Sequence, residues 1–173
     1  MEEEESKKML KRLFLMRHSV TESFAVSDFK RNLTEYGKTK AKNQAIKLET
    51  FLKKENINLE YCFYSSANRA TQTFDVLCKT MNLNIKIHKT RALYLTGIKE
   101  LKNIFKTYID DIKNLENIII IAHNFGVSDI ASILCGREIY MDTADIIGLG
   151  IDTDDSWYSL LDYENSWDII YER

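Results

Sequence analysis

The 173-residue sequence has no proline, few glycines and only three histidines, and it lacks any long apolar run. No segment approaches the roughly 18 to 20 consecutive apolar residues that a membrane-spanning helix requires, so neither a membrane protein nor a membrane partner is expected. Residues 1–5 are acidic apart from Met1, whereas a secretory signal would be basic and then apolar. The sequence therefore predicts a cytoplasmic protein.

Charge and cysteine content exclude further classes. The formal net charge of -2 does not suit a broad basic surface, so no nucleic-acid partner is expected. Cys62, Cys78 and Cys135 lack the spacing of metal ligands, and we interpret them as small buried thiols rather than as disulfides or zinc ligands. With 45% hydrophobic and 29% charged residues, the chain has the composition of one soluble globular domain.

The hydrophobic pattern predicts a parallel sheet with helices. We expect a flexible charged lead over residues 1–9 and a single domain over residues 10–173. Apolar runs at residues 13–16, 61–64 and 118–122 predict strands that are buried on both faces. Four apolar faces at helical spacing follow these runs: Ala41, Ala45, Leu48 and Leu52; Ala70, Phe74, Leu77 and Met81; Ile98, Leu101, Phe105, Tyr108 and Ile112; and Val127, Ile130, Ala131 and Leu134.

Local signals refine this outline. Thr34 and Ser66 are the predicted N-caps of the first two helices. The alternation over residues 84–88 predicts an edge strand with His88 on its exposed side.

The C-terminal part has a different pattern. Apolar-rich runs at residues 146–151, 157–163 and 167–171 are joined by polar turns too short to hold crossover helices, which predicts antiparallel strands. The predicted fold class is therefore α/β, a three-layer α/β/α sandwich whose central sheet is mainly parallel and carries antiparallel C-terminal strands.

Cationic residues follow three of the predicted strands. Arg17 and His18 end the first, Arg69 lies in the first turn of the helix after the second, and His123 follows the isoleucine-rich strand. The carboxyl ends of parallel strands meet at one edge of a sheet, where ligands bind. A cation near a helix N-terminus is unfavourable unless an anion shares the site. Guanidinium and imidazole groups beside free helix N–H groups therefore predict a phosphoryl site.

One histidine of such a site is suited to nucleophilic attack. Nearby guanidinium groups lower the pKa of an imidazole and keep it neutral near pH 7, where it is a good nucleophile. The predicted reaction class is phosphoryl transfer through a phosphohistidine, with Arg17, Arg69 and a protonated His123 stabilising the transition state. This chemistry requires no cofactor and no metal.

Four motifs resemble, in order, those of the histidine phosphatase superfamily, whose fold is phosphoglycerate mutase-like. They are LMRHSVT at residues 15–21, RNLTEYG at 31–37, YSSANRATQT at 64–73 and IAHNFG at 121–126. The small size and the ending at residues 141–144 followed by strands look most like the SixA-type phosphohistidine phosphatases. The resemblance extends over roughly residues 12–170, and an ordered set of motifs is far more specific than a single Arg-His pair.

The resemblance implies roles for individual residues. It makes His18 the phosphorylated nucleophile, and Arg17, Arg69 and His123 the rest of the phosphate pocket. Arg31, Ser19 and Asn124 are the further substrate-binding candidates, although Arg31 is equally placed to pair with Glu35, four residues on.

Three positions depart from the family pattern. Ser19 stands where a glycine is usual, and Asn32 and Phe125 stand where proline is usual.

Three functions remain open at this stage. Phosphohistidine releases an imidazole that leaves already protonated near pH 7, whereas a phosphate ester needs a carboxylic acid to protonate its alkoxide. Residues 90–117 leave no room for a cap domain, which favours a phosphorylated protein, such as a phosphorelay or phosphotransfer component, as the substrate. The alternatives are a phosphomonoesterase for a small phosphate compound, with Glu100 or Glu22 as the acid, and a non-catalytic phosphate-binding module that Ser19 has disabled.

Overall fold

The computed structural model describes residues 9–173 and contains a six-stranded sheet in the order β3-β2-β4-β1-β5-β6. The predicted lead lies outside the described residues up to residue 8, so its flexibility stays a prediction, and Met9 already belongs to the first strand. The strands are β1 (Met9–Arg17), β2 (Tyr61–Ser65), β3 (Lys86–Thr90), β4 (Asn117–Ala122), β5 (Ile146–Thr153) and β6 (Asp168–Glu172).

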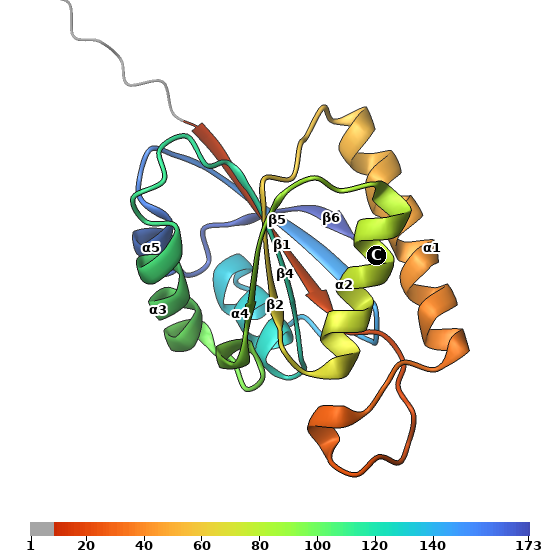
Figure 1. Cartoon of the computed structure of the whole chain (residues 1–173). Coiled ribbons are helices and arrows are strands. Elements are labelled where there is room, and N and C mark those ends of the chain that lie inside the picture. Colours follow the sequence, from red (N-terminus) through yellow and green to blue (C-terminus); the bar gives the residue numbers. More distant parts are fainter. Residues whose placement is uncertain (1–8) are drawn as a thin grey trace, which may run out of the picture.

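Helices cover both faces of this sheet. They are α1 (Glu35–Lys54), α2 (Asn68–Met81), α3 (Ile98–Tyr108), α4 (Gly126–Cys135) and α5 (Trp157–Leu160), with short 3₁₀ helices η1 (Asp28–Lys30) and η2 (Arg91–Leu93). Helices α1 and α2 lie on one face, and α3, α4 and α5 lie on the other (Figure 1). Among the described residues, no helix is long and apolar enough to cross a membrane.

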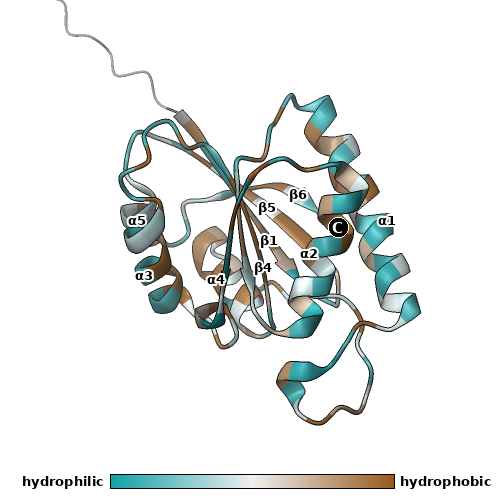
Figure 2. Cartoon of the chain, in the orientation of Figure 1, coloured by the Kyte–Doolittle hydropathy of each residue, from teal (hydrophilic) through white to brown (hydrophobic). Residues whose placement is uncertain are grey.

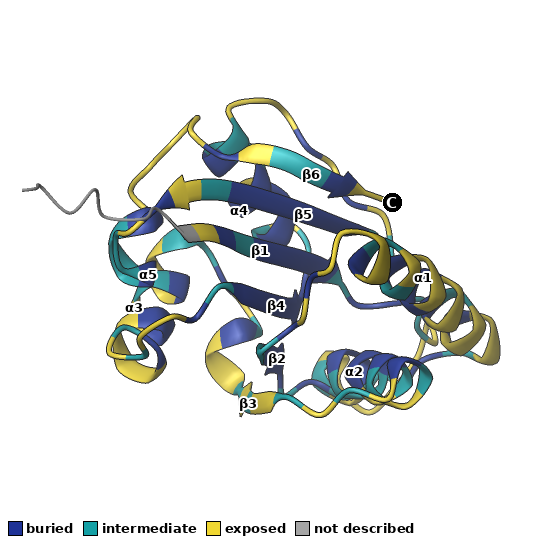
Figure 3. Cartoon of the chain, turned by 90° about the horizontal axis from the view of Figure 1, so that it is seen from above, coloured by how far each residue is buried: buried dark blue, intermediate teal, exposed yellow. Residues whose placement is uncertain are grey.

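The predicted helix faces pack on the sheet. The apolar faces of α1, α2 and α4 are buried as the 3.6-residue period requires, while the opposite faces of the long helices are hydrophilic and exposed (Figures 2 and 3). In α3, Leu101 and Phe105 are buried, but Tyr108 is 42% exposed and the helix ends before Ile112. Cys62 is buried, the other two cysteines are half-buried, and all three are free.

The predicted fold class is confirmed. Strands β1, β2, β3 and β4 are parallel, and β5 and β6 are antiparallel to their neighbours. In the register of β1 and β4, Arg17 lies opposite Ala122, so His18 and His123 leave the sheet side by side. The backbone N–H of His18 donates to the carbonyl of Ala122 at 3.0 Å, which fixes this arrangement.

The prediction of a strand at residues 157–163 is wrong. Trp157–Leu160 forms the short helix α5, which begins after Ser156, whose hydroxyl accepts a hydrogen bond from the N–H of Ser159. The Trp157 indole N–H donates to the carbonyl of Leu115 at 2.9 Å and thereby holds the helix in the core. Such a short apolar run suits a helix or a strand equally, so the long-range contact decides.

Two smaller predictions are also wrong. Helix α2 begins after Ala67 rather than after Ser66. On β3, His88 packs against Tyr108 with ring centroids 3.8 Å apart, whereas Ile87 is 52% exposed. The end of α3 therefore covers the face of β3 that the alternation had assigned to solvent.

Candidate active site

His18 lies directly beyond the carboxyl end of β1 with a defined tautomer. Its Nδ1 is 2.8 Å from the carbonyl oxygen of Ser19, and because a carbonyl only accepts, Nδ1 carries the proton and Nε2 carries the lone pair. The Nε–H of Arg69 donates to this Nε2 at 3.2 Å. Burial, followed by the charges of Arg69 and Arg17, lowers the pKa of His18 to about 4. His18 is thus neutral at pH 7 with an unprotonated Nε2.

Ser19 anchors the loop behind this histidine. Its hydroxyl donates to the carbonyl of Gly37 at 2.7 Å and its N–H donates to Thr73 Oγ1 at 3.1 Å. A Cβ on Gly37 would lie 2.1 Å from the carbonyl oxygen of Val20, so only glycine allows α1 to approach this closely. The hydroxyl of Ser19 is therefore committed to the scaffold and does not face the nucleophile.

His123 follows β4 and offers a donor to the same site. Its Nε2 is 2.8 Å from Ser65 Oγ, which accepts the N–H of Ala67 and so has its own proton free for His123. When the Ser65 hydroxyl donates to Nε2, the imidazole proton lies on Nδ1, which has no partner among the described residues. Burial, with the charges of His18 and Arg69, lowers the pKa of His123 to about 3, so in this structure it is neutral. A protonated His123 in the transition state stays a prediction. The two imidazole rings are 5.1 Å apart.

Arg69, in the first turn of α2, is held by an acidic residue that the sequence analysis missed. Its Nη1 donates to the Asp28 carbonyl at 2.6 Å, and its Nη2 to the Asp28 carboxylate at 2.9 Å. Tyr94 also donates to this carboxylate, and the hydrogen bonds from Tyr94 and Arg69 lower the pKa of Asp28. Asp28 thereby supplies an anion near the helix start and turns Arg69 Nε toward His18. The only sequence signal was an acidic residue three positions before Arg31.

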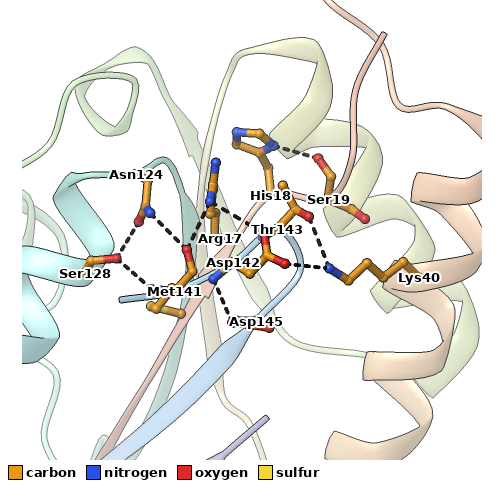
Figure 4. A network of polar contacts seen from close by, with 10 residues as sticks. All are labelled: Arg17, His18, Ser19, Lys40, Asn124, Ser128, Met141, Asp142, Thr143 and Asp145. Carbon is orange, nitrogen blue, oxygen red and sulfur yellow. Dashed lines mark hydrogen bonds and ion pairs between the residues drawn. The ribbon is translucent and has the colours of Figure 1, made fainter. Parts of the chain in front are cut away.

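Arg17 lies between Asn124 and His18 in Figure 4 and is held by the segment before β5. Its Nη1 donates to the Met141 carbonyl at 3.0 Å and lies 4.0 Å from Asp142 Oδ1. Asn124 donates to the same carbonyl at 2.9 Å and accepts from Ser128 at 2.6 Å. The side chain of Asn124, predicted to bind substrate, thus braces the start of α4 against the segment that holds Arg17.

Arg31 lies on the loop between β1 and α1. It donates to Thr21 and lies 3.4 Å from Asp28, whereas Glu35 pairs with Lys38 at 2.6 Å. The alternative pairing of Arg31 with Glu35 is therefore wrong.

Asn32, next in sequence, ties this loop to α2. Its side-chain oxygen accepts hydrogen bonds from Asn68 at 3.1 Å and Gln72 at 2.9 Å. Gln72 in turn accepts the N–H of Leu33 at 2.7 Å. At a position where the family pattern has proline, hydrogen bonds to a helix thus hold the loop in place.

Several buried nitrogens of the site have no hydrogen-bond partner within the protein. In the described part of the chain, five buried side-chain polar atoms are unpaired, and three of them belong to this site: Arg17 Nε, Arg31 Nε and His123 Nδ1. Buried donors are normally hydrogen-bonded. Two guanidinium donors and an imidazole nitrogen in one cationic site suit an anion that has several oxygens, such as a phosphoryl group.

The carboxyl groups around the site do not provide an obvious acid. Glu100 accepts the N–H of Gly97 at 3.0 Å and caps α3, and Glu22 is exposed. The two carboxylates that pair with pocket arginines, Asp28 and Asp142, both have a lowered pKa and are ionised at pH 7. Burial raises the pKa of Asp145, but its carboxylate accepts the N–H of Asp142 at 2.7 Å.

The chain was compared with known proteins. Neither a family model nor a curated protein sequence matches it. Solved structures do match over nearly the whole length. The protein histidine phosphatase SixA in complex with tungstate superposes with a TM-score of 0.72 at 20% identity, over 93% of this chain and 95% of that one.

Two further structures extend the comparison. A protein from Agrobacterium tumefaciens assigned as a SixA phosphohistidine phosphatase has a TM-score of 0.70 at 18% identity, covering 94% of this chain and 97% of that one. A mycobacterial glucosyl-3-phosphoglycerate phosphatase has a TM-score of 0.62 at 14% identity, covering 93% and 97%. The chain therefore has the phosphoglycerate mutase-like α/β fold that these histidine phosphatases share.

Proposed function

We propose that this chain is a metal-independent phosphohistidine phosphatase in which His18 carries the phosphoryl group between substrate and water. The proposal depends mainly on the protonation state and contacts of His18. His18 is neutral, its Nδ1–H is bound to a carbonyl, and its unprotonated Nε2 accepts from Arg69 beside His123. This is the state that a nucleophilic imidazole needs near pH 7.

The reaction proceeds in two steps. In the first, the lone pair of His18 Nε2 forms a bond to phosphorus while the bond between phosphorus and the substrate imidazole breaks. The substrate ring carries a proton on its other nitrogen, so it keeps the electron pair and departs as neutral imidazole. In the second, an oxygen of water forms a bond to phosphorus while the bond between phosphorus and His18 Nε2 breaks and its electron pair returns to Nε2. The water protons pass to phosphate and solvent, which releases inorganic phosphate and restores neutral His18. The guanidinium groups of Arg17 and Arg69 and the Nδ1–H of His123 stabilise the charge on the phosphoryl oxygens.

The leaving group distinguishes phosphohistidine from a phosphate ester. An imidazole has a pKa near 6.5 and leaves without strong acid catalysis, whereas an alkoxide requires a proton donor. Asp28 and Asp142, which pair with the pocket arginines, are held as carboxylates and cannot donate a proton at pH 7. The electrostatics around the site therefore favour phosphohistidine.

The comparisons agree with this proposal. One similar structure is a protein histidine phosphatase bound to tungstate, which is a tetrahedral oxyanion like phosphate. Between β3 and β4 the chain holds only η2 and α3, so no added domain stands over the site. We therefore propose a phosphorylated protein as the substrate, such as a phosphorelay or phosphotransfer component, in the cytoplasm.

A small phosphate ester is the second candidate substrate. It is favoured by the similarity to the glucosyl-3-phosphoglycerate phosphatase, although that similarity is weaker. In this case the acid would have to come from Glu100 or Glu22, and neither bonds to the arginines or histidines of the site.

Phosphate release from matched substrates tests the proposal. We expect kcat/KM for free N-phosphohistidine to exceed that for glucose 6-phosphate or 3-phosphoglycerate by at least a hundredfold. His18→Ala should lower turnover more than a thousandfold, because it removes the nucleophile, while His88→Ala removes a histidine outside the site and should leave turnover unchanged. Faster release from the esters would establish the second candidate. Phosphate binding without release from any substrate would establish a binding module.

A further inference from the structure

The five most exposed large apolar side chains of the described residues lie on loops beside the candidate site. Among the described residues, eleven large apolar side chains are exposed, and six of them have exposed fractions between 37% and 67%. The other five are at least 70% exposed, and we call them the apolar rim: Phe24, Val26, Leu95, Phe125 and Tyr140.

Two members of the apolar rim lie on the loop that holds Arg69. Val26 and Phe24, 95% and 89% exposed, precede Asp28 by two and four residues. Asp28 binds Arg69 through both its carbonyl and its carboxylate. Because consecutive Cα atoms are about 3.8 Å apart, the backbone of Val26 lies within about 8 Å of the residue that clamps this arginine.

The other three members lie on the loops that follow β3 and β4 and precede β5. Leu95 follows Tyr94, whose ring centroid is 5.3 Å from that of His123, and Phe125 follows His123 by two residues. These two loops touch, since a Cβ on Gly126 would lie 1.9 Å from the carbonyl oxygen of Thr96. Tyr140 precedes Met141, whose carbonyl accepts from Arg17. The members of the apolar rim therefore lie on four loops, and each of these loops contains a residue that contacts or adjoins the buried cationic site.

The residues of the cationic site are buried and those of the apolar rim are exposed, and this difference indicates which kind of substrate binds. The buried cationic site contains His18, Arg69 and His123, which are at most 7% exposed. A substrate that delivers a phosphoryl group to them therefore comes close to the loops that carry the apolar rim. Exposed apolar groups that cluster, rather than being scattered singly, mark a surface that binds a partner. A sugar phosphate carries hydroxyl groups around its ring and has little apolar area for such a rim to bury, whereas a protein can place apolar side chains beside its phosphorylated residue.

Resting on the proposed function, we propose that the apolar rim is the docking surface for the protein substrate. It binds apolar side chains that flank the phosphohistidine while the phosphoryl group enters the cationic site. The rim thereby selects protein-borne phosphohistidine with apolar neighbours over free phosphohistidine.

Two synthetic phosphohistidine peptides of equal length test this docking role. One carries leucine on both sides of the phosphohistidine, and the other carries serine. For the unaltered protein, kcat/KM should be at least tenfold higher for the leucine peptide, which corresponds to about 1.4 kcal/mol of transition-state binding. In the double variant Phe24→Ser/Leu95→Ser this ratio should fall to within twofold of one, with turnover of free phosphohistidine unchanged. The matched control Ile87→Ser alters an exposed apolar residue on β3 and should retain the full ratio.

The remaining outcomes each overturn the proposal. The rim does not bind the flanking residues if the unaltered protein turns over the two peptides equally. The same conclusion follows if the double variant keeps the ratio of kcat/KM between the leucine and serine peptides. A dimer in sedimentation experiments that the double variant converts to a monomer would assign the rim to a second copy of the chain. No phosphate release from either peptide or from free phosphohistidine would refute the proposed function itself, and the docking role with it.

Discussion

The two ends of the parallel strands both gather polar side chains, but they satisfy them differently. At the amino ends, Arg12 donates to the Asn117 side chain at 2.9 Å, and Glu60 accepts the backbone N–H groups of Glu116 and Asn117 at 2.9 and 2.8 Å. No side-chain atom of these residues is buried without a partner. At the carboxyl ends, the pocket nitrogens of Arg17, Arg31 and His123 remain unpaired.

This difference separates polar groups that stabilise the fold from polar groups that bind a ligand. A network that pairs all its members contributes to stability, and each lost partner leaves a buried group unsatisfied. Donors that share one positive site and lack acceptors within the protein contribute little to folding. They are instead preorganised for an anion. The amino ends therefore act as a structural clamp and the carboxyl ends as a receptor.

The largest expected effects come from replacing one arginine at each end of the strands and comparing kcat/KM with the free energy of unfolding. Arg69→Ala should lower kcat/KM for phosphohistidine at least a hundredfold, because preorganised donors to transition-state charge are typically worth that much. It removes two hydrogen bonds to Asp28 but also a cation beside Arg17, so the free energy of unfolding should change by no more than about 1 to 2 kcal/mol. Enzyme kinetics and urea denaturation measure the two effects.

Arg12→Ala is the matched control at the other end. It should leave kcat/KM unchanged and lower the free energy of unfolding by about 1 to 2 kcal/mol, since the Asn117 side chain loses its donor. If Arg12→Ala impairs turnover as much as Arg69→Ala does, the proposed division between a structural end and a ligand-binding end is wrong.

The next largest effect concerns stability in acid. The pKa of His18 is lowered to about 4 from its ordinary value of 6.5, so the unfolded chain binds a proton that the folded chain does not as the pH falls below 6.5. As the pH falls from 7 to 5, His18 alone should therefore lower the free energy of unfolding by about 2 kcal/mol.

Urea denaturation at pH 7 and pH 5 measures this loss. His18→Gln removes the titrating group and should show a loss about 2 kcal/mol smaller than the unaltered protein, whereas Arg12→Ala should keep the full loss. Equal acid sensitivity in the His18→Gln variant would mean that His18 is not buried in the neutral form.

Most of the fold and the centre of the site could be predicted from the sequence. Continuous apolar runs specify strands buried on both faces, and parallel strands bring their carboxyl ends together, so His18, Arg69 and His123 had to meet. Asp28 could not be found in this way, because its contact with Arg69 spans 41 positions and depends on how an irregular loop folds back.

The errors have the same physical origin. Residues 157–163 were assigned to a strand because so short a run carries too little periodicity to distinguish a strand from the helix that residues 157–160 form. The neutral state of His123 also lay beyond the sequence, since it results from burial together with two neighbouring charged or polar groups.

The most direct test of the central claim is to capture the phosphoryl group on the protein. Radiolabelled N-phosphohistidine is mixed with the chain for milliseconds and the reaction is quenched in alkali, in which phosphohistidine is stable. We predict that mass spectrometry places the label on His18, that acid releases it, and that His18→Ala acquires none. Steady phosphate release with no labelled protein at any time, or label on another residue, would contradict this account.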